Sequence, residues 1–130
     1  MQDLVDRFRD NKAEYLEELC KLVRIPSISF PGFDAEEVAR SADAVALLLN
    51  KSGFNNVEIL TVPGAHPYVY GEIISDASKP TILLYAHHDV QPVGDREKWQ
   101  TEPFEPTQIG DRLFGRGAAD DKAGILVHVA

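Results

Sequence analysis

The sequence predicts an α/β domain, a layered sandwich in which helices flank a mixed β-sheet. Three observations predict it: two stretches with helical apolar spacing come first, three strand-like runs follow them, and a helix-like stretch comes last. Helices and strands that each carry one apolar face bury those faces by packing in layers. The chain has 130 residues, of which 44% are hydrophobic and 26% charged, which is ordinary for one globular domain.

The first predicted helix extends from the region of Leu4 to Val23. Its apolar residues recur mostly at spacings of three, four and seven, which places them on one side of a helix. Pro26 ends this helix, because the residue before a proline avoids helical backbone angles. Residues 27–32 are predicted to form a loop.

The second predicted helix begins near Asp34. Asp34 and Glu37 have the spacing of a capping box, in which each side chain bonds the backbone amide of the other residue. Gly53 marks the end, because glycine readily adopts the backbone conformation that follows a helix. The expected buried face of this helix consists of Val38, Ala42, Val45 and Leu49.

The strand-like runs cover residues 57–62, 68–75 and 81–86. The third reads Thr-Ile-Leu-Leu-Tyr-Ala, and such an unbroken apolar run is typical of a strand that is buried on both faces. Residues 87–117 form a predicted polar loop, divided by a short hairpin that turns at Gly110-Asp111. After Asp120 the chain is again helix-like.

Composition excludes several classes of function. Lys and Arg number 13 against 21 Asp and Glu, so the net charge is −8, and such an acidic chain repels nucleic acid. The single cysteine, Cys20, cannot form an internal disulfide, and the first residues lack the apolar segment of a secretory signal. No apolar run approaches the roughly 18 residues that span a bilayer. We therefore expect a cytoplasmic protein without nucleic-acid or membrane partners.

A first candidate site, His87-His88-Asp89, directly follows the third predicted strand. Binding sites in α/β sheets form at the carboxyl ends of strands. Alternate residues of an extended chain share a face, so His87 and Asp89 are expected to point the same way. A carboxylate beside an imidazole can fix its tautomer for metal binding, which makes His87 a candidate metal ligand and Asp89 a candidate catalytic residue that supports it. A hydrogen-bonded polar pair without a metal is the alternative.

A second candidate site lies in the glycine-rich stretch 115–124. Its glycines permit a tight turn, and Asp120 and Asp121 fall at the start of the last helix. Two carboxylates repel phosphate and the spacing differs from that of a phosphate-binding loop, so a nucleotide-binding module is disfavoured. Asp120 and His87 are both ligand types that zinc accepts. A turn with an aspartate cap in a non-catalytic α/β scaffold stays open as an alternative, and it predicts that His87 and Asp120 lie far apart.

Three segments carry a resemblance to a known family. They are residues 83–92 (Leu-Leu-Tyr-Ala-His-His-Asp-Val-Gln-Pro), Trp99 with Pro103-Phe104, and residues 113–122 (Leu-Phe-Gly-Arg-Gly-Ala-Ala-Asp-Asp-Lys). In order and spacing they resemble the co-catalytic zinc exopeptidases, which include carboxypeptidases, carnosinase-like dipeptidases, aminoacylases, acetylornithine deacetylase and succinyl-diaminopimelate desuccinylase. The resemblance extends over essentially the whole chain and implies the α/β fold of that family.

The resemblance also implies roles for individual residues. His87 would be the terminal ligand of one of two zinc ions, Asp89 the carboxylate that supports it, and Asp120 the carboxylate that bridges both ions. Cobalt and manganese are alternative metals, and a cis peptide bond is expected between Asp120 and Asp121. The implied activity is metal-dependent hydrolysis of dipeptide or C-terminal amide bonds. Deacylation of N-acyl amino acids is the alternative activity, so the expected partner is a small peptide or an N-acyl amino acid.

In this family the general-base glutamate and further metal ligands lie well beyond the position of Asp120. Residues 1–130 therefore resemble the N-terminal part of a catalytic domain, incomplete at its C-terminal end and without the lid or dimerisation domain. We expect the chain by itself to be inactive, because a catalytic zinc ion normally takes three protein ligands. We also expect it to self-associate through an exposed edge of the 81–86 strand or through the apolar face of the last helix.

Overall fold

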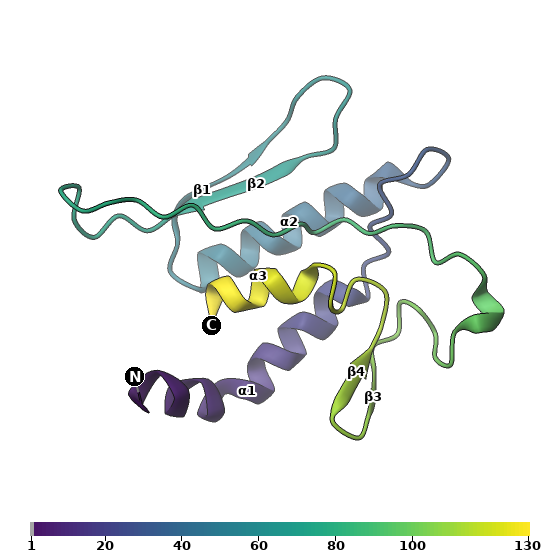
Figure 1. Cartoon of the computed structure of the whole chain (residues 1–130). Helices are drawn as coiled ribbons and strands as arrows, with labels where there is room; N and C mark the ends of the chain where they lie inside the picture. Colours follow the sequence, from purple (N-terminus) through teal and green to yellow (C-terminus); the bar gives the residue numbers. More distant parts are fainter. Residues whose placement is uncertain (1) are drawn as a thin grey trace.

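The computed structural model describes residues 2–130, which form three α-helices, four short strands and one turn of 3-10 helix (Figure 1). In chain order these elements are α1 (Gln2–Val23), α2 (Ala35–Lys51), β1 (Asn55–Leu60), β2 (Tyr68–Glu72), η1 (Arg96–Lys98), β3 (Thr107–Ile109), β4 (Arg112–Phe114) and α3 (Lys122–Val129).

The hydrophobic core lies where the second half of α1 packs against α2 and α3. Figure 1 shows α3 running between the other two helices. The first half of α1 extends beyond this core, and its apolar residues Leu4, Val5 and Phe8 are exposed. The predicted helix is therefore confirmed, whereas only its last turns bury an apolar face. The core residues are Leu19, Leu22, Val23, Val45, Leu48, Ala118, Ile125 and Leu126.

The ends of α2 follow local sequence signals. The Asp34 side chain accepts a hydrogen bond of 2.9 Å from the backbone amide of Glu36, which caps the helix. Glu37 does not complete the predicted capping box, because its carboxylate pairs instead with Arg40 at 2.8 Å. At the other end Gly53 has a φ of 86°, a conformation that favours glycine, as the stop signal predicts.

Two separate antiparallel hairpins replace the predicted mixed sheet. β1 pairs with β2, with an irregularity between Asn55 and Glu58, and β3 pairs with β4 around a turn in which Gly110 has a φ of 60°. The β1–β2 hairpin packs against α2. The first two predicted strands and the short hairpin are thus confirmed with slightly different bounds, and the α/β fold class holds.

The predicted strand at residues 81–86 is wrong. Within residues 2–130 no segment pairs with it, so it is extended chain without a ladder of hydrogen bonds. Its apolar side chains are exposed rather than buried on both faces; Leu83, for instance, is 89% exposed. A strand exists only through hydrogen bonds to a neighbour, and a sequence pattern reports burial preference without supplying that neighbour.

A short parallel contact connects the end of this extended segment to the chain that follows α1. Ile28 and Val90 form an isolated parallel bridge. The amide of Val90 donates to the carbonyl of Ser27 at 2.8 Å, and the amide of Ser29 donates to the carbonyl of Val90 at 3.3 Å. Residues 87–90 are thereby fixed beside the core, close to the start of α3. In the part of the chain that the structure describes, no helix is both long and apolar enough to cross a membrane.

Candidate metal centre

His87 and Asp120 come together although they lie 33 positions apart in the chain. The His87 Nε2 atom is 2.9 Å from Oδ1 of Asp120. The Asp120 side chain is 91% exposed and that of His87 is 34% exposed, so both groups remain accessible from solvent. The structure therefore brings together the two residues that the sequence nominates as metal ligands, and a scaffold with the two residues far apart does not describe it.

Asp89 lies behind the His87 ring. Nδ1 of His87 is 3.3 Å from the Asp89 carboxylate and 3.0 Å from the Asp89 backbone carbonyl. Both partners are acceptors, so they favour a proton on Nδ1. On the other side of the ring Nε2 faces Asp120 and donates to its carboxylate when it carries a proton, and a metal ion held between the two groups would take the place of that proton.

Asp121 belongs to the same turn as Asp120 but faces a different way. The peptide bond between them is cis, as the family resemblance implies. The Asp121 carboxylate lies 3.4 Å from the backbone amide of His87 and packs over Gly124 in the first turn of α3. Asp121 therefore connects the helix start to the His87 segment, while Asp120 is the one of these two adjacent aspartates that faces the imidazole.

Three serine hydroxyls support the His87–Asp89 segment from the side of α1 and α2. Ser27 and Ser41, both fully buried, donate to the backbone carbonyl of His88 at 2.7 and 3.1 Å. Ser29 donates to Oδ2 of Asp89. Sequence reasoning missed these residues. For Ser27 and Ser29 the one signal is their alternation around Ile28, which places both hydroxyls on one face of extended chain, and this signal does not extend to Ser41 on α2.

Lys122 is a second group that the sequence did not reveal. It is fully buried, and its Nζ donates to the carbonyls of Leu22 at 2.7 Å and Ile25 at 2.9 Å. Leu22 is in the last turn of α1 and Ile25 lies just beyond it, and each carbonyl accepts from one backbone amide as well, that of Ile25 and that of Ser27 respectively. Burial lowers the pKa of Lys122 to about 8, against the opposing charges of Asp89 and Glu37. The spacing of Lys122 to Ile125 and Leu126 is the missed signal, because it places the lysine on the buried face of α3.

The charges around His87 change its protonation equilibrium. Burial disfavours the charged ring, but the bonds to the Asp89 carbonyl and the Asp120 carboxylate outweigh burial, and the pKa of His87 is raised. Burial also opposes ionisation of Asp89, and the Ser29 hydroxyl together with the His87 charge lowers its pKa nevertheless. Two carboxylates thus create a local preference for positive charge at the position between them.

His88 points away from this site. Its Nε2 lies 3.1 Å from the carbonyl of Pro67, in the segment before β2, and burial lowers its pKa. As expected from the alternation of side chains, it makes a loop contact.

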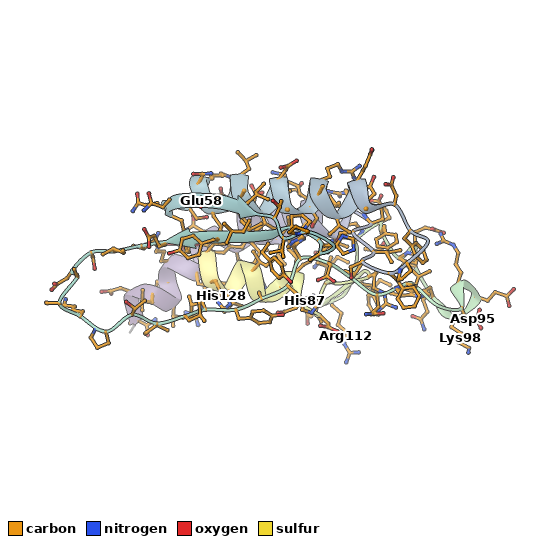
Figure 2. All side chains as sticks on the ribbon, turned by 90° about the horizontal axis from the view of Figure 1, so that it is seen from above. Glu58, His87, Asp95, Lys98, Arg112 and His128 are labelled. Atoms are coloured by element: carbon orange, nitrogen blue, oxygen red, sulfur yellow. The ribbon has the colours of Figure 1, made fainter. Side chains whose placement is uncertain are left out.

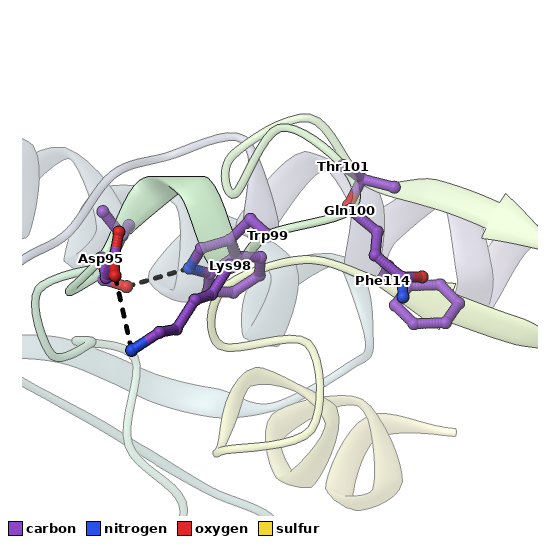
Figure 3. A pocket seen from close by; sticks show the side chains of 7 residues that line it. Asp95, Lys98, Trp99, Gln100, Thr101 and Phe114 are labelled. Atoms are coloured by element: carbon purple, nitrogen blue, oxygen red, sulfur yellow. Dashed lines mark hydrogen bonds and ion pairs between the residues drawn. The ribbon is translucent and has the colours of Figure 1, made fainter.

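A separate hollow of about 400 Å³ lies near η1. It is lined by Lys98 of η1, by the flanking residues Asp95, Trp99 and Thr101, and by Phe114 of β4 (Figure 3). Arg116 covers the Trp99 ring at 5.2 Å from its centroid. Figure 2 shows Asp95 and Lys98 at one end of the molecule, well apart from His87. This hollow is therefore distinct from the His87–Asp120 pair.

Known proteins are similar in sequence to the segment that contains His87 and Asp120, and some are similar to nearly the whole chain. Residues 83–130, which contain both candidate ligands, match the model of peptidase family M20/M25/M40. The Cys-Gly metallodipeptidase of Schizosaccharomyces pombe is 33% identical over 136 residues, which cover 97% of this chain and 28% of that protein. The chain belongs to peptidase family M20/M25/M40.

Two further proteins show what this member of the M20 family is similar to. The crystal structure of human carnosine dipeptidase 1 superposes with a TM-score of 0.86 at 28% identity, covering 98% of this chain and 29% of that one. The succinyl-diaminopimelate desuccinylase of a Wolbachia pipientis strain is 34% identical over 119 residues, covering 92% of this chain and 28% of that protein. The chain thus spans less than a third of each relative. The expected family and its α/β zinc-exopeptidase-like fold are confirmed.

The donor chemistry of this M20 family member suits a divalent metal in part. An imidazole nitrogen and a carboxylate oxygen that face each other from two segments are both ligands that zinc accepts. Across residues 2–130, however, no group of three His, Cys, Asp or Glu side chains is arranged to hold a metal ion. His87 and Asp120 therefore fit as part of a metal site rather than as the whole of one.

Proposed function

We propose that the protein containing this chain is a metal-dependent hydrolase of amide bonds in small peptides, dipeptides foremost. The observation that carries the proposal is the approach of His87 Nε2 to Asp120 Oδ1 at 2.9 Å, with Asp89 behind the ring. The similarity to a Cys-Gly metallodipeptidase and to carnosine dipeptidase supports dipeptides as the substrate class.

In this proposal each of the three residues has one task. His87 offers Nε2 as the terminal ligand of one zinc ion, and Asp120 offers its carboxylate as the bridge between two ions. Asp89 positions His87 by accepting from Nδ1. Bound metal supplies polarisation of the scissile carbonyl and lowers the pKa of water. Cobalt and manganese are alternative metals, because both accept the same nitrogen and oxygen donors.

We propose further that residues 1–130 are the N-terminal part of the catalytic domain. The general base, the remaining ligands and the lid or dimerisation domain would then be supplied by other residues of the full-length protein. The isolated chain should accordingly show no turnover when given zinc and a panel of dipeptides. Metal-dependent turnover by the isolated chain would contradict this part of the proposal.

The location that we propose for the protein is the cytoplasm. Cys20 is a free thiol, which agrees with that location.

A second candidate activity is removal of the acyl group from N-acyl amino acids. The similarity to a succinyl-diaminopimelate desuccinylase favours it, because the same amide chemistry serves both substrate classes. Hydrolysis of dipeptides and of N-succinyl and N-acetyl amino acids by the full-length protein, compared under one condition, separates the two. Faster turnover of acylated amino acids would replace the dipeptidase assignment.

The metal site is tested with His87→Gln and Asp120→Asn in the full-length protein. Each change removes one donor, so zinc affinity and turnover should both fall by about tenfold or more. His66→Gln is the matched control, because His66 is an exposed histidine in the loop between β1 and β2. Equal zinc affinity in all four proteins would disprove the proposed ligands.

A further inference from the structure

The carboxylate of Asp89 divides its two oxygens between two partners. Oδ1 lies 3.3 Å from Nδ1 of His87, and Oδ2 accepts the hydroxyl hydrogen of Ser29. Ser29 therefore touches Asp89 on the side opposite to the imidazole. The hydroxyl contacts neither His87 nor Asp120 among the hydrogen bonds of the structure, so any influence on the metal donors passes through Asp89.

The backbone holds Ser29 in place for this contact. The amide of Ser29 donates to the carbonyl of Val90, and the amide of Val90 donates to the carbonyl of Ser27. Ile28 and Val90 are both buried within this short parallel pairing. The positions of Ser29 and Asp89 are thus fixed relative to each other by main-chain bonds, and the hydroxyl contact requires no ordering of a mobile loop.

We propose that Ser29 is a positioning residue of the candidate metal centre. Its hydroxyl holds the Asp89 carboxylate in the orientation in which Oδ1 faces His87 Nδ1. The proposal deepens the proposed function and rests on it, because it concerns the presentation of His87 to a metal ion.

The physical effect acts through the tautomer of the His87 ring. A carboxylate that is bonded on one oxygen has one orientation in which the other oxygen meets Nδ1. Without Ser29 the Asp89 side chain can rotate away, and only the backbone carbonyl at 3.0 Å then holds the proton on Nδ1, against the Asp120 carboxylate that accepts it at Nε2. A ring that loses this preference presents Nε2 as a donor for part of the time, and a protonated Nε2 cannot bind metal.

The first experiment measures zinc affinity of the full-length protein by competition with a chromophoric chelator. Ser29→Thr and Ser29→Val form a matched pair, because the two side chains have nearly the same shape and only threonine keeps a hydroxyl. We expect zinc affinity to fall about 10–100-fold in Ser29→Val and Ser29→Ala, the range typical of lost supporting partners of metal ligands. Ser29→Thr should retain most of the affinity, and Ser75→Ala, an exposed serine, should retain all of it.

The second experiment needs no metal. The ¹⁵N chemical shifts of the His87 ring in the metal-free protein, at alkaline pH where the ring is neutral, report which nitrogen carries the proton. The Asp120 carboxylate, 2.9 Å from Nε2, competes for the proton, so we expect Ser29→Val and Ser29→Ala to hold more of it on Nε2 than the wild type and Ser29→Thr do. In an Asp89→Ala background, Ser29→Ala should cause no further change in the His87 tautomer, because Ser29 affects the ring only through the Asp89 carboxylate.

The outcomes separate this inference from the proposed function. Wild type that binds no zinc would remove the proposed function, and the ring tautomer would still decide the role of Ser29. Unchanged zinc affinity in Ser29→Val and Ser29→Ala would overturn the role of Ser29 while the ligand assignments stand. A ring tautomer that is identical in all Ser29 variants would overturn that role as well.

Discussion

The carboxylate of Asp121 occupies the space that a side chain at Gly124 would need. A Cβ atom at position 124 would meet all three atoms of that carboxyl group at or below 3.0 Å. Gly124 lies inside α3 with an ordinary helical backbone, so backbone geometry does not require glycine there. Glycine is required at position 124 because the Asp121 carboxylate lies against it, and that carboxylate in turn faces the backbone amide of His87.

This contact predicts an inverted result for a common stabilising substitution. Gly→Ala inside a helix ordinarily gains up to about 1 kcal/mol. Gly124→Ala should instead lower the free energy of unfolding by about 1–3 kcal/mol, because the added methyl group displaces the Asp121 carboxylate. Chemical denaturation of the single variants and of Gly124→Ala with Asp121→Ser checks this. The double variant should recover most of the loss, and simple additivity would refute the contact.

The buried amine of Lys122 predicts a large stability effect at the junction of α1 and α3. Lys122→Met keeps the length of the side chain but removes the two Nζ bonds, and each carbonyl keeps one backbone donor, the amide of Ile25 at 3.1 Å for Leu22 and the amide of Ser27 at 2.9 Å for Ile25. Hydrogen bonds to charged groups contribute about 1.5–3 kcal/mol each, so we expect a loss of about 1–3 kcal/mol once the apolar gain of methionine is included. Thermal and urea denaturation measure it. Lys98→Met is the control, since the Lys98 side chain is exposed, and a similar loss in both variants would contradict the prediction.

The ion pairs of Lys51 predict a dependence of stability on pH. Lys51 Nζ lies 2.8 Å from Glu18 on α1 and 2.9 Å from Glu14, and its bond lowers the pKa of Glu18 despite partial burial. A lowered carboxyl pKa stabilises the fold above its ordinary value near 4.5, and this stabilisation is lost as pH falls through the folded pKa. Lys51→Met should therefore be less stable than wild type at neutral pH and equally stable in strong acid. Denaturation curves across this range test the prediction, with Lys79→Met, an exposed pair with Asp76, as the control that should show little difference at any pH.

The exposed segment 81–86 predicts association of the isolated chain. Extended backbone that has no strand partner and carries exposed apolar side chains is a template for pairing with a second copy, although the Tyr85 carbonyl already contacts His128. We expect sedimentation to show dimers or larger species at high concentration. Leu83→Glu should shift the distribution toward monomer, whereas Leu47→Glu, at a leucine that is 71% exposed on α2, should not. A wild-type chain that stays monomeric would disprove this expectation.

Local signals predicted those parts of the fold that local interactions decide. Pro26, Asp34 and Gly53 act on neighbouring backbone, and each marks a helix end in the structure. The strand predicted at residues 81–86 failed because pairing depends on a partner that no local pattern contains. Apolar composition there indicates a preference for burial, and exposed chain results where nothing in residues 2–130 covers it.

For the candidate site, as for the fold, the sequence predicted the local geometry but not the contacts between distant segments. The shared face of His87 and Asp89 follows from strand geometry, whereas the approach of Asp120 to His87 depends on the tertiary fold and was expected from the zinc-ligand chemistry of the two residue types and from the family resemblance. Ser29 and Lys122 have ordinary residue types in ordinary positions. Their importance comes from what they touch, Asp89 in one case and the end of α1 in the other, and these contacts join residues 60 and about 100 positions apart.

The parallel bridge between Ile28 and Val90 gives the protein a built-in reporter. The Val90 amide is sequestered by the Ser27 carbonyl, one residue beyond Asp89, and Val90 is neither of the two proposed metal ligands. Its rate of deuterium exchange measures how often the support beneath the imidazole comes apart, without altering any group that takes part in binding. A loss of protection at this one amide would reveal a loosened site before any assay of turnover does.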